Sequence, residues 1–423
     1  MTFKILTLGC KVNTYESNVM KDALINEGFY EVANNADIYI INTCTVTNTA
    51  DNKSMKLIRR TRKENENSII VVCGCMVQNK KVNIDEADIV IGNIGNSKIA
   101  DYIKEYIKNK TKKFNIEDIT DVPFESMVLN NFNKTRAFVK IQDGCNNFCT
   151  YCIIPYVRGN VRCKNKEDVI NEIKALVNNG HKEIVLTGIH TGNYKFDDYD
   201  FASLLNDIVK IESLERLRIS SIEVTELNDR VLDVIKNNKI LVDHMHIPLQ
   251  SGSNTVLKRM NRKYDKEYFI NKIEKIRSIR PSISITTDVI VGFPGETIEE
   301  FNETIDTIKK VNFSKLHVFP YSKRDGTKAA LMDNQIDDIT KKERAKKLIE
   351  LSQQLENNYM NKFINKEVIF IPEVYKDGFI IGHTGNYLSI KSTGKKEDIG
   401  IPIRVKILKN DYPYMIGQIK DTI

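Results

Sequence analysis

Three cysteines near the middle of the chain have the spacing of a metal cluster. Cys145, Cys149 and Cys152 form a C-x3-C-x2-C run, and closely spaced thiolates are soft ligands that favour iron–sulfur clusters or zinc. A structural zinc site usually has four protein ligands, and no fourth Cys or His lies close to this run. A 4Fe-4S cluster held by three cysteines leaves one iron open, so the spacing favours a cluster that binds a substrate or cofactor.

Three further cysteines lie far apart in the sequence but in similar surroundings. Cys10, Cys44 and Cys75 each come just after a short apolar segment that is predicted to be a strand. The carboxyl ends of parallel strands share one edge of a sheet, where ligands gather. This placement leaves two alternatives open: a second metal site, or three buried thiols of the kind that is common in protein cores.

The amino-terminal cysteines belong to a predicted open parallel α/β domain. Short apolar segments alternate with segments of helical periodicity, as in βα units around a parallel sheet. The predicted strands are 3–8, 38–41, 69–72 and 87–91, and the predicted helices are 15–27, 53–63 and 98–107. Residues 110–133 are polar with weak periodicity and are predicted to be a linker, so we place the domain at residues 1–115.

The central cysteines belong to a second alternating series. Its predicted strands are 137–142, 183–187, 216–220, 244–249, 284–291 and 315–319, with helices near 166–178, 200–210, 226–236, 264–279 and 297–310. Six βα repeats predict a partial (β/α)6 barrel, whose active site would lie at the carboxyl ends of the strands. The cysteine run follows the first of these strands. With a long charged helix at 338–362, this domain is expected to span residues 134–362.

From residue 366 onward the pattern changes to short strands separated by turn sequences such as Asp377-Gly378 and Gly385-Asn386. This pattern predicts a small all-β barrel at residues 363–423. The segment has more basic than acidic residues, and its tyrosines could stack on single-stranded nucleic acid. An equally plain alternative places several of these aromatic rings in the core of the module itself.

Composition narrows the functional classes. Of 423 residues, 41% are apolar and 28% charged, which is ordinary globular usage and excludes wholesale disorder. The longest apolar run, residues 69–77, is about half of the ~18 residues that a membrane span needs, and the amino terminus lacks the features of a secretion signal. We therefore expect a cytoplasmic protein with reduced thiols and no membrane partner. The formal charge of +7 permits a nucleic-acid partner without requiring one.

The central cysteine run resembles the signature of radical S-adenosylmethionine (radical SAM) enzymes, in which an aromatic residue, here Tyr151, precedes the last cysteine. The resemblance implies that Cys145, Cys149 and Cys152 hold a catalytic 4Fe-4S cluster. It also implies that the open iron binds the methionine part of SAM and that Tyr151 lies beside the adenine.

The remaining motifs resemble the methylthiotransferases within that superfamily. The matching segments occur in family order along essentially the whole chain and are residues 8–13, 42–44, 74–78, 154–159, 186–188, 247–253, 260–264 and 292–297, while 382–387 resembles the RNA-binding TRAM domain. The resemblance implies that Cys10, Cys44 and Cys75 hold a second, auxiliary 4Fe-4S cluster. Cys73 stands two residues before Cys75 and is the alternative ligand, but Cys75 shares the strand–Gly–Cys context of Cys10, so we expect Cys75 to be the ligand. Cys163 lies outside both sets and is expected to be a free thiol.

The resemblance also suggests further contacts with SAM. Gly292 and Glu296 belong to a Gly-Phe-Pro-Gly-Glu segment after a predicted strand, near which the resemblance places the adenine and ribose; an ordinary turn is the alternative. Thr187 and Gly188 follow the second barrel strand, near the expected position of the amino group of SAM. Gln250 follows the fourth strand, where it could contact the ribose or the substrate.

The implied reaction inserts sulfur and a methyl group at an unactivated aromatic C–H bond, which requires a radical-generating cofactor. Residues 8–13 and 217–223 look most like the branch that methylthiolates N6-threonylcarbamoyladenosine at C2, next to the tRNA anticodon (position 37). The expected cofactors are two 4Fe-4S clusters and SAM, of which two molecules are used. The expected partners are the tRNA anticodon stem-loop, a low-potential electron donor and a sulfur donor.

Two alternatives stay open. Sister branches of the family act on isopentenyladenosine in tRNA or on an aspartate of a ribosomal protein. From another functional class, the chain would be a non-catalytic iron–sulfur protein that binds RNA. An intact cysteine run with an open iron speaks against this last alternative, and detection of 5′-deoxyadenosine would separate the two classes.

Overall fold

The alternating segments at the amino terminus form a parallel sheet with helices on both faces, as predicted. In this computed structural model, which describes residues 1–80 and 84–423, six parallel strands lie in the order β2-β1-β3-β4-β5-β6. Two separate apolar cores cover the two faces, one under α1 and α4 and the other under α2 and α3. The elements are β1 (Thr2–Thr7), α1 (Lys11–Asn26), β2 (Tyr30–Glu31), β3 (Ile38–Thr43), α2 (Asn48–Glu64), β4 (Ile69–Gly74), α3 (Cys75–Lys80), β5 (Ile89–Ile91), α4 (Ile99–Asn109) and β6 (Lys113–Asn115).

Two edge strands of this sheet have no counterpart in the predicted elements. β2 has only two residues, and β6 consists of Lys-Phe-Asn within the segment predicted as a linker. β6 pairs in parallel with β5 and so belongs to the sheet. The rest of the predicted linker has no helix or strand, but Met127, Leu129 and Phe132 are buried in the main apolar core. The segment is therefore packed into the molecule, although its periodicity is weak.

The second series forms the predicted partial barrel. Two three-stranded parallel sheets, β13-β10-β7 and β14-β15-β16, are joined by a bridge between Leu217 and Leu241. The strands are β7 (Arg136–Lys140), β10 (Glu183–Thr187), β13 (Arg216–Ile219), β14 (His244–His246), β15 (Ser284–Val291) and β16 (Lys315–Pro320). The helices are α5 (Ile154–Arg158), α6 (Lys166–Asn178), α7 (Phe201–Ile208), α8 (Asp229–Asn237), α9 (Asn254–Arg259), α10 (Lys266–Ile279) and α11 (Ile298–Val311). The loops contain two short antiparallel strand pairs. These are β8 (Gln142–Asp143) with β9 (Arg162–Cys163), and β11 (Lys195–Phe196) with β12 (Tyr199–Asp200).

A long helix, α12 (Asp338–Asn361), packs along β16 and leads into a closed five-stranded barrel. The barrel strands are β17 (Glu367–Lys376), β18 (Phe379–Thr384), β19 (Ser389–Thr393), β20 (Ile403–Asp411) and β21 (Tyr414–Thr422). We call residues 363–423 the C-terminal module. The predicted fold class, an open α/β domain, a partial (β/α)6 barrel and a small β barrel, is confirmed.

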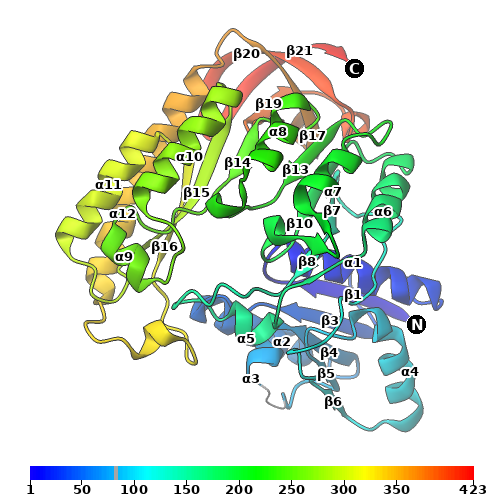
Figure 1. The fold of residues 1–423 in the computed structure, drawn as a ribbon. Coiled ribbons are helices and arrows are strands. Elements are labelled where there is room, and N and C mark those ends of the chain that lie inside the picture. The colour runs from blue at the N-terminus through cyan, green and yellow to red at the C-terminus, as the bar shows by residue number, and fades with distance from the viewer. Residues whose placement is uncertain (81–83) are drawn as a thin grey trace.

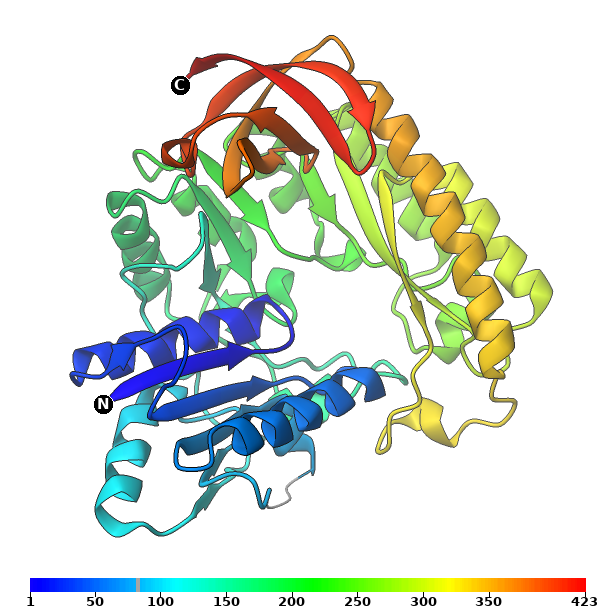
Figure 2. The ribbon, with the colours of Figure 1, turned by 180° about the vertical axis from the view of Figure 1, so that it is seen from behind.

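The three parts are stacked, with the partial barrel between the other two (Figures 1 and 2). At the carboxyl ends of the barrel strands, Lys140 of β7 pairs with Glu16 of α1 at 2.8 Å. At the amino ends, Arg136 of β7 pairs with Glu373 of the C-terminal module at 3.0 Å. The cysteine run thus faces the amino-terminal sheet, and the module closes the opposite end. Among the described residues, no helix is long and apolar enough to cross a membrane.

Candidate metal centres and substrate cavity

The central cysteine run lies in the loop that follows β8, at the carboxyl end of the barrel. Gly144 starts the loop with a φ of +72°, and a Cβ there would lie 1.9 Å from the carbonyl oxygen of Asn160. Only glycine allows the chain to turn so tightly against its neighbour. The amide of Cys152 then donates to the carbonyl of Cys149 at 3.0 Å, which folds the run back on itself.

Two cationic groups contact this run that were not assigned a role from the sequence. Arg262 Nη1 donates to Cys149 Sγ at 3.3 Å while its Nη2 pairs with Glu223. His190 Nδ1 lies 3.9 Å from Cys145 Sγ, and its other ring nitrogen pairs with Glu226. Burial alone would lower the pKa of His190, but the contacts with Cys145 and Glu226 outweigh burial and raise the pKa to about 10.

A sequence signal for both groups existed. Arg262 lies in the segment 260–264 that resembles the family, and His190 comes two residues after Gly188. The spacing of Arg262 and His190 from the cysteines does not predict these contacts. Each contact forms only when distant segments of the chain come together in the folded barrel.

The amino-terminal cysteines lie after three adjacent strands, as the strand pattern predicted. Cys10 follows β1 and is the N-cap residue of α1, Cys44 follows β3, and Cys75 is the first residue of α3 directly after β4. β3 lies between β1 and β4 in the sheet, and Thr43 pairs with Gly74. The three residues are therefore placed at one edge.

Gly74 makes the turn into Cys75 possible. Its φ is +96°, and a Cβ would lie 2.5 Å from Asn42 Oδ1 and 2.7 Å from the carbonyl oxygen of Thr43. The Asn42 amide is fixed in turn, because Asn13 Nδ2 donates to its Oδ1 at 3.1 Å. The motif residues around the cysteines thus hold the strand ends in place.

Arg158 links the two sets of cysteines. It ends α5, which begins two residues after Cys152, and its guanidinium is fully buried between the barrel and the amino-terminal domain. Nη2 donates to Asn13 Oδ1 and to Glu16 Oε2, each at 3.1 Å, and Nη1 contacts Asp143 at 3.3 Å. Burial alone would lower the pKa of Arg158, but its contacts with Cys75, Glu16 and Asp143 outweigh burial and hold the pKa well above its usual range.

The same buried network contains Lys140, which pairs with Asp143 at 2.7 Å. Cys75 itself packs against Ile153, directly before α5, and Val157 within α5. The segment that directly follows the central cysteines therefore packs against Cys75 of the amino-terminal set.

Burial also affects the thiols. It raises the pKa of Cys75 to about 11 and that of Cys152 to about 12, and it raises the pKa of Cys44. The pKa of Cys73 is raised further, because Cys73 lies in the core under α1, with Sγ 3.9 Å from Met20 Sδ. Cys10, in contrast, is exposed.

Among the described residues, no three His, Cys, Asp or Glu side chains come close enough together to hold a single metal ion. The fit to an iron–sulfur cluster therefore rests on the donors. Each set offers three soft thiols and no competing carboxylate in the motif itself, and each has a buried guanidinium in contact or beside it, Arg262 and Arg158. Such a donor set suits a cubane, whose sulfides and thiolates carry negative charge.

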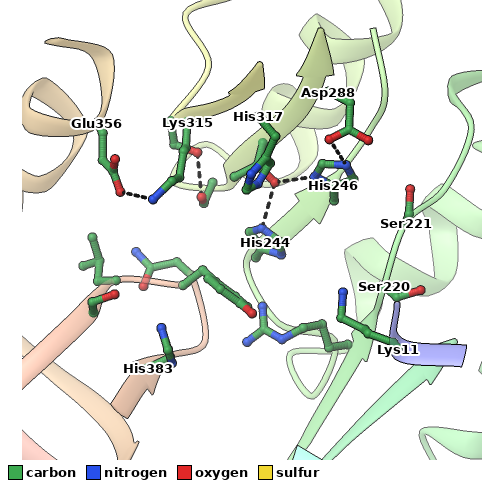
Figure 3. A pocket seen from close by; sticks show the side chains of 18 of the residues that line it. Lys11, Ser220, Ser221, His244, His246, Asp288, Lys315, His317, Glu356 and His383 are labelled. Atoms are coloured by element: carbon green, nitrogen blue, oxygen red, sulfur yellow. Dashed lines mark hydrogen bonds and ion pairs between the residues drawn. The ribbon is translucent and has the colours of Figure 1, made fainter. Parts of the chain in front are cut away.

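A cavity of about 600 Å³ occupies the barrel lumen (Figure 3). All three parts of the molecule line it: Cys10 and Lys11 from the amino-terminal domain, inward side chains of the barrel strands, and residues 383–389 of the C-terminal module. Thr187 and Gly188, predicted to contact SAM, lie in its wall, whereas Tyr151, Gln250, Gly292 and Glu296 do not.

Those four residues lie elsewhere at the carboxyl end of the barrel. Tyr151 packs edge-on against Phe293, with ring centroids 6.4 Å apart, which brings it next to the segment of Gly292. Gln250 bridges to Val289 of β15 through its backbone. The carboxylate of Glu296 accepts from the amide of Gly292 at 2.7 Å and pairs with Arg344 at 2.5 Å, so it fixes this turn.

Comparison with known proteins matches both parts of the chain that carry the cysteine sets. The pattern of the Radical SAM superfamily matches residues 139–308, and that of the Uncharacterized protein family UPF0004 matches residues 2–93. Among solved structures, the radical SAM methyltransferase TsrM from Kitasatospora setae matches with a TM-score of 0.56 and 13% identity, covering 75% of this chain and 72% of that one. This similarity shows the shared fold alone.

Curated relatives match over nearly the whole chain. The threonylcarbamoyladenosine tRNA methylthiotransferase MtaB of Bacillus subtilis (strain 168) is 46% identical over 97% of this chain and 95% of its own length. The protein of the same name from Aquifex aeolicus (strain VF5) is 37% identical over 95% of this chain and 98% of its own. A tRNA-2-methylthio-N(6)-dimethylallyladenosine synthase of Clostridium botulinum (strain Langeland / NCTC 10281 / Type F) is 36% identical over 98% of this chain and 96% of its own length. The chain belongs to the radical SAM methylthiotransferases, as its motifs predicted.

Proposed function

We propose that the chain methylthiolates N6-threonylcarbamoyladenosine at C2 in tRNA, next to the anticodon at position 37. The observation that carries this proposal is the 46% identity over 97% of the chain to a relative named for that reaction. Two thiol sets on either side of the buried Arg158, and a lumen lined by all three parts of the molecule, support it.

Six cysteines hold the cofactors in this proposal. Cys145, Cys149 and Cys152 hold the 4Fe-4S cluster that binds SAM, and Cys10, Cys44 and Cys75 hold the auxiliary cluster. When bound, these groups and two molecules of SAM supply the low-potential electron, the radical and the transferred sulfur and methyl group. Electrons and sulfur come from external donors.

The residues of the chain stabilise the cysteine thiolates and orient SAM. Burial disfavours thiolates, and the guanidinium of Arg262 at Cys149 and that of Arg158 beside Cys75 offset this cost by placing fixed positive charge next to them. We assign Tyr151 and Gly292 to the adenosine part of SAM and Thr187 and Gly188 to its amino group.

Gln250 keeps the predicted contact with ribose or substrate. Glu296 positions the Gly292 turn, since its carboxylate is already engaged by Gly292 and Arg344.

The substrate base enters the lumen. An adenosine in the anticodon loop can be splayed out of its stack at less cost than a base in a duplex. Cys10 and Thr187 share the wall of the cavity, so a base bound there would lie between the residues assigned to the two cofactor sites. The tRNA stem would remain outside.

The proposal is tested with the intact chain, reconstituted anaerobically with iron and sulfide. We expect about eight irons per chain, since two thiol sets are present and each suits a cubane. With SAM, a reductant and tRNA containing threonylcarbamoyladenosine, nucleoside mass spectrometry should detect the methylthio product.

Three variants separate the roles. Cys145→Ala should abolish 5′-deoxyadenosine formation, Cys10→Ala should keep some of it but lose the thiolated product, and Cys163→Ala should keep both. Thiolation of isopentenyladenosine in tRNA, with none of threonylcarbamoyladenosine, would assign the chain to the sister substrate. Bound clusters without 5′-deoxyadenosine would favour a non-catalytic RNA-binding protein.

A further inference from the structure

Positive charge in the lumen exceeds the negative charge that can pair with it. The acidic side chains that line the cavity are Asp288 and Glu356. Asp288 lies 3.3 Å from His246 Nε2, and Glu356 pairs with Lys315 at 2.8 Å. Lys11 and Arg218, which also line the cavity, have no carboxylate of the lining as a partner.

Arg218 has a donor left over. Its side chain is 2% exposed, and Nε donates to Glu183 at 2.7 Å. Glu183 also faces Arg216 at 3.6 Å, so one carboxylate serves two guanidinium groups. Nη1 of Arg218 is buried without a hydrogen-bond partner. A buried guanidinium donor without an acceptor costs free energy that a bound anion would recover.

Lys11 brings a second cation to the same wall. It is the first residue of α1, next to Cys10, and Figure 3 shows its side chain reaching into the cavity beside Ser220. Across the described residues it has neither an ion pair nor a side-chain hydrogen bond. Its ammonium group and the Arg218 guanidinium therefore line the same cavity, and neither is paired there with a carboxylate of the lining.

The rest of this wall is polar and contains a further aromatic side chain of the C-terminal module. His244, which is buried, bonds Thr286 Oγ1 through Nε2 at 3.1 Å and has no partner for Nδ1. Tyr387 of the C-terminal module stacks on His244 with ring centroids 4.8 Å apart, and the Arg218 guanidinium lies over the same ring at 4.6 Å. The guanidinium is thereby held in place against the wall.

We propose that Lys11 and Arg218 form a carboxylate-binding subsite that takes the α-carboxylate of the threonylcarbamoyl group. This inference rests on the proposed function and deepens it by naming the residues that select the substrate. The threonylcarbamoyl group ends in a carboxylate, and Lys Nζ and Arg Nη1 are two donors suited to it. Lys11 and Arg218 lie in the segments 8–13 and 217–223 that resemble the threonylcarbamoyladenosine branch.

The subsite also explains rejection of an apolar substituent. An isopentenyl group in the same place would leave the Lys11 ammonium and the Nη1 donor of Arg218 desolvated and without an acceptor. A site built to pair with a polar group strongly disfavours an analogue that lacks it. Selectivity then comes as much from this penalty as from the contact with the correct substrate.

The test measures binding, so it does not depend on turnover. The intact, reconstituted chain is titrated with three anticodon stem-loop RNAs that carry threonylcarbamoyladenosine, its methyl ester or isopentenyladenosine. For the unaltered chain we expect the ester to bind about 10- to 100-fold more weakly than the free acid, as for loss of a charged hydrogen bond. Lys11→Met and Arg218→Met should each reduce the ratio of ester to acid dissociation constants. Each should also reduce the difference in affinity between the threonylcarbamoyladenosine and isopentenyladenosine RNAs.

Two variants serve as controls. Lys11→Arg keeps the charge and should keep the preference for the acid. Lys21→Met removes a lysine of the same helix that pairs with Glu31 outside the cavity, and should leave the ratio unchanged. Lys11 is half-buried, so Lys11→Met tests the subsite even if Arg218→Met fails to fold.

The outcomes are distinguishable. Equal binding of acid and ester by the unaltered chain, with thiolation of threonylcarbamoyladenosine intact, would overturn the subsite and leave the proposed function standing. Failure to thiolate threonylcarbamoyladenosine, with thiolation of isopentenyladenosine, would overturn both.

Discussion

Cys73 and Cys75 are two residues apart, yet they face different surroundings. Cys73 Sγ points into the core under α1, 3.9 Å from Met20 Sδ, while Cys75 packs against Ile153 and Val157 at the domain contact. Cys73→Ala should therefore leave the iron content at its full value and lower the free energy of unfolding by about 1 kcal/mol, because it deletes a buried sulfur. Cys75→Ala should remove about half of the iron, since one of two cubanes loses a ligand.

Iron analysis and urea denaturation of the two variants check this prediction, with Cys163→Ala as a thiol outside both sets. If Cys73→Ala lost iron and Cys75→Ala kept it, the assignment of the ligand would be reversed.

The raised pKa of Cys75 gives a stability change with pH in the chain without clusters. An unfolded thiol ionises near pH 9, whereas burial raises the folded pKa to about 11. As pH rises, Cys75 therefore loses its proton later in the folded state than in the unfolded state. The contribution of the protonated thiol to the free energy of unfolding is fully present below pH 9 and is lost as pH rises through about 11. At pH 10 this loss amounts to about 1 kcal/mol.

The measurement is denaturation of the reduced, cluster-free chain at pH 8 and pH 10, compared with Cys75→Ala. The variant should lose less stability over this range than the unaltered chain. An identical loss in both would show that Cys75 ionises equally in the folded and unfolded states.

At the scale of elements, the packing of α5 against its neighbours depends on a buried group of charges from α5, α1 and β8. Arg158 at its end is buried with Glu16 of α1 and Asp143 of β8. Arg158→Met would leave two buried carboxylates short of a partner, and removing one member of a buried pair typically costs about 3–5 kcal/mol. We expect a loss of that size in the free energy of unfolding.

Lys104→Met is the matched control, because Lys104 and Glu27 form an exposed pair in the same domain. Exposed pairs contribute about 0–1 kcal/mol, so this variant should change stability little. Equal, small effects of both variants would mean that Arg158 does not hold the domains together.

The elements themselves were largely predictable. The helix at 166–178 and the strand at 183–187 have the predicted bounds, because both have clear apolar periodicity. β6 escaped prediction because three residues carry no periodicity. α1 begins at Lys11, four residues before the predicted start, and Cys10 at its N-cap makes no side-chain capping hydrogen bond that would mark this start.

For the site, local spacing was enough to single out Cys145, Cys149 and Cys152, whereas Cys10, Cys44 and Cys75 became candidates through their placement after predicted strands and through the family resemblance. Arg158, Arg262 and His190 could not be found in that way, since each meets its cysteine only once distant segments have packed. Glu296 was predicted to contact SAM, whereas in the structure its carboxylate holds the Gly292 turn and pairs with Arg344. This pairing could not be predicted from the sequence, because Arg344 lies 48 residues further along the chain.

For the whole molecule, the C-terminal module has two separable effects on RNA. Its basic excess would contribute contacts with phosphates, whereas Tyr387 is part of the cavity wall. Deleting residues 366–423 should raise the apparent KM for tRNA and flatten its dependence on salt, because fewer counterions are released on binding. Tyr387→Leu should raise KM without changing the salt slope.

Steady-state rates at several salt concentrations check both changes, and 5′-deoxyadenosine formed without RNA serves as the control for folding. The residues assigned to SAM all belong to the barrel, and two of them, Tyr151 and Gly292, lie outside the cavity wall that the module completes, so this background reaction should survive. An unchanged salt slope after the deletion would place the phosphate contacts elsewhere.

Arg158 lies only six residues after Cys152, yet it is anchored on Asn13 and Glu16 of the other domain. A chimaera of two relatives joined within residues 116–133 would take the anchors from one parent and the arginine from the other. Such an exchange succeeds only where both parents preserve the same contact, or where residues 154–159 travel with the amino-terminal domain. We therefore expect recombination between relatives to keep these two domains together, although the fold divides them.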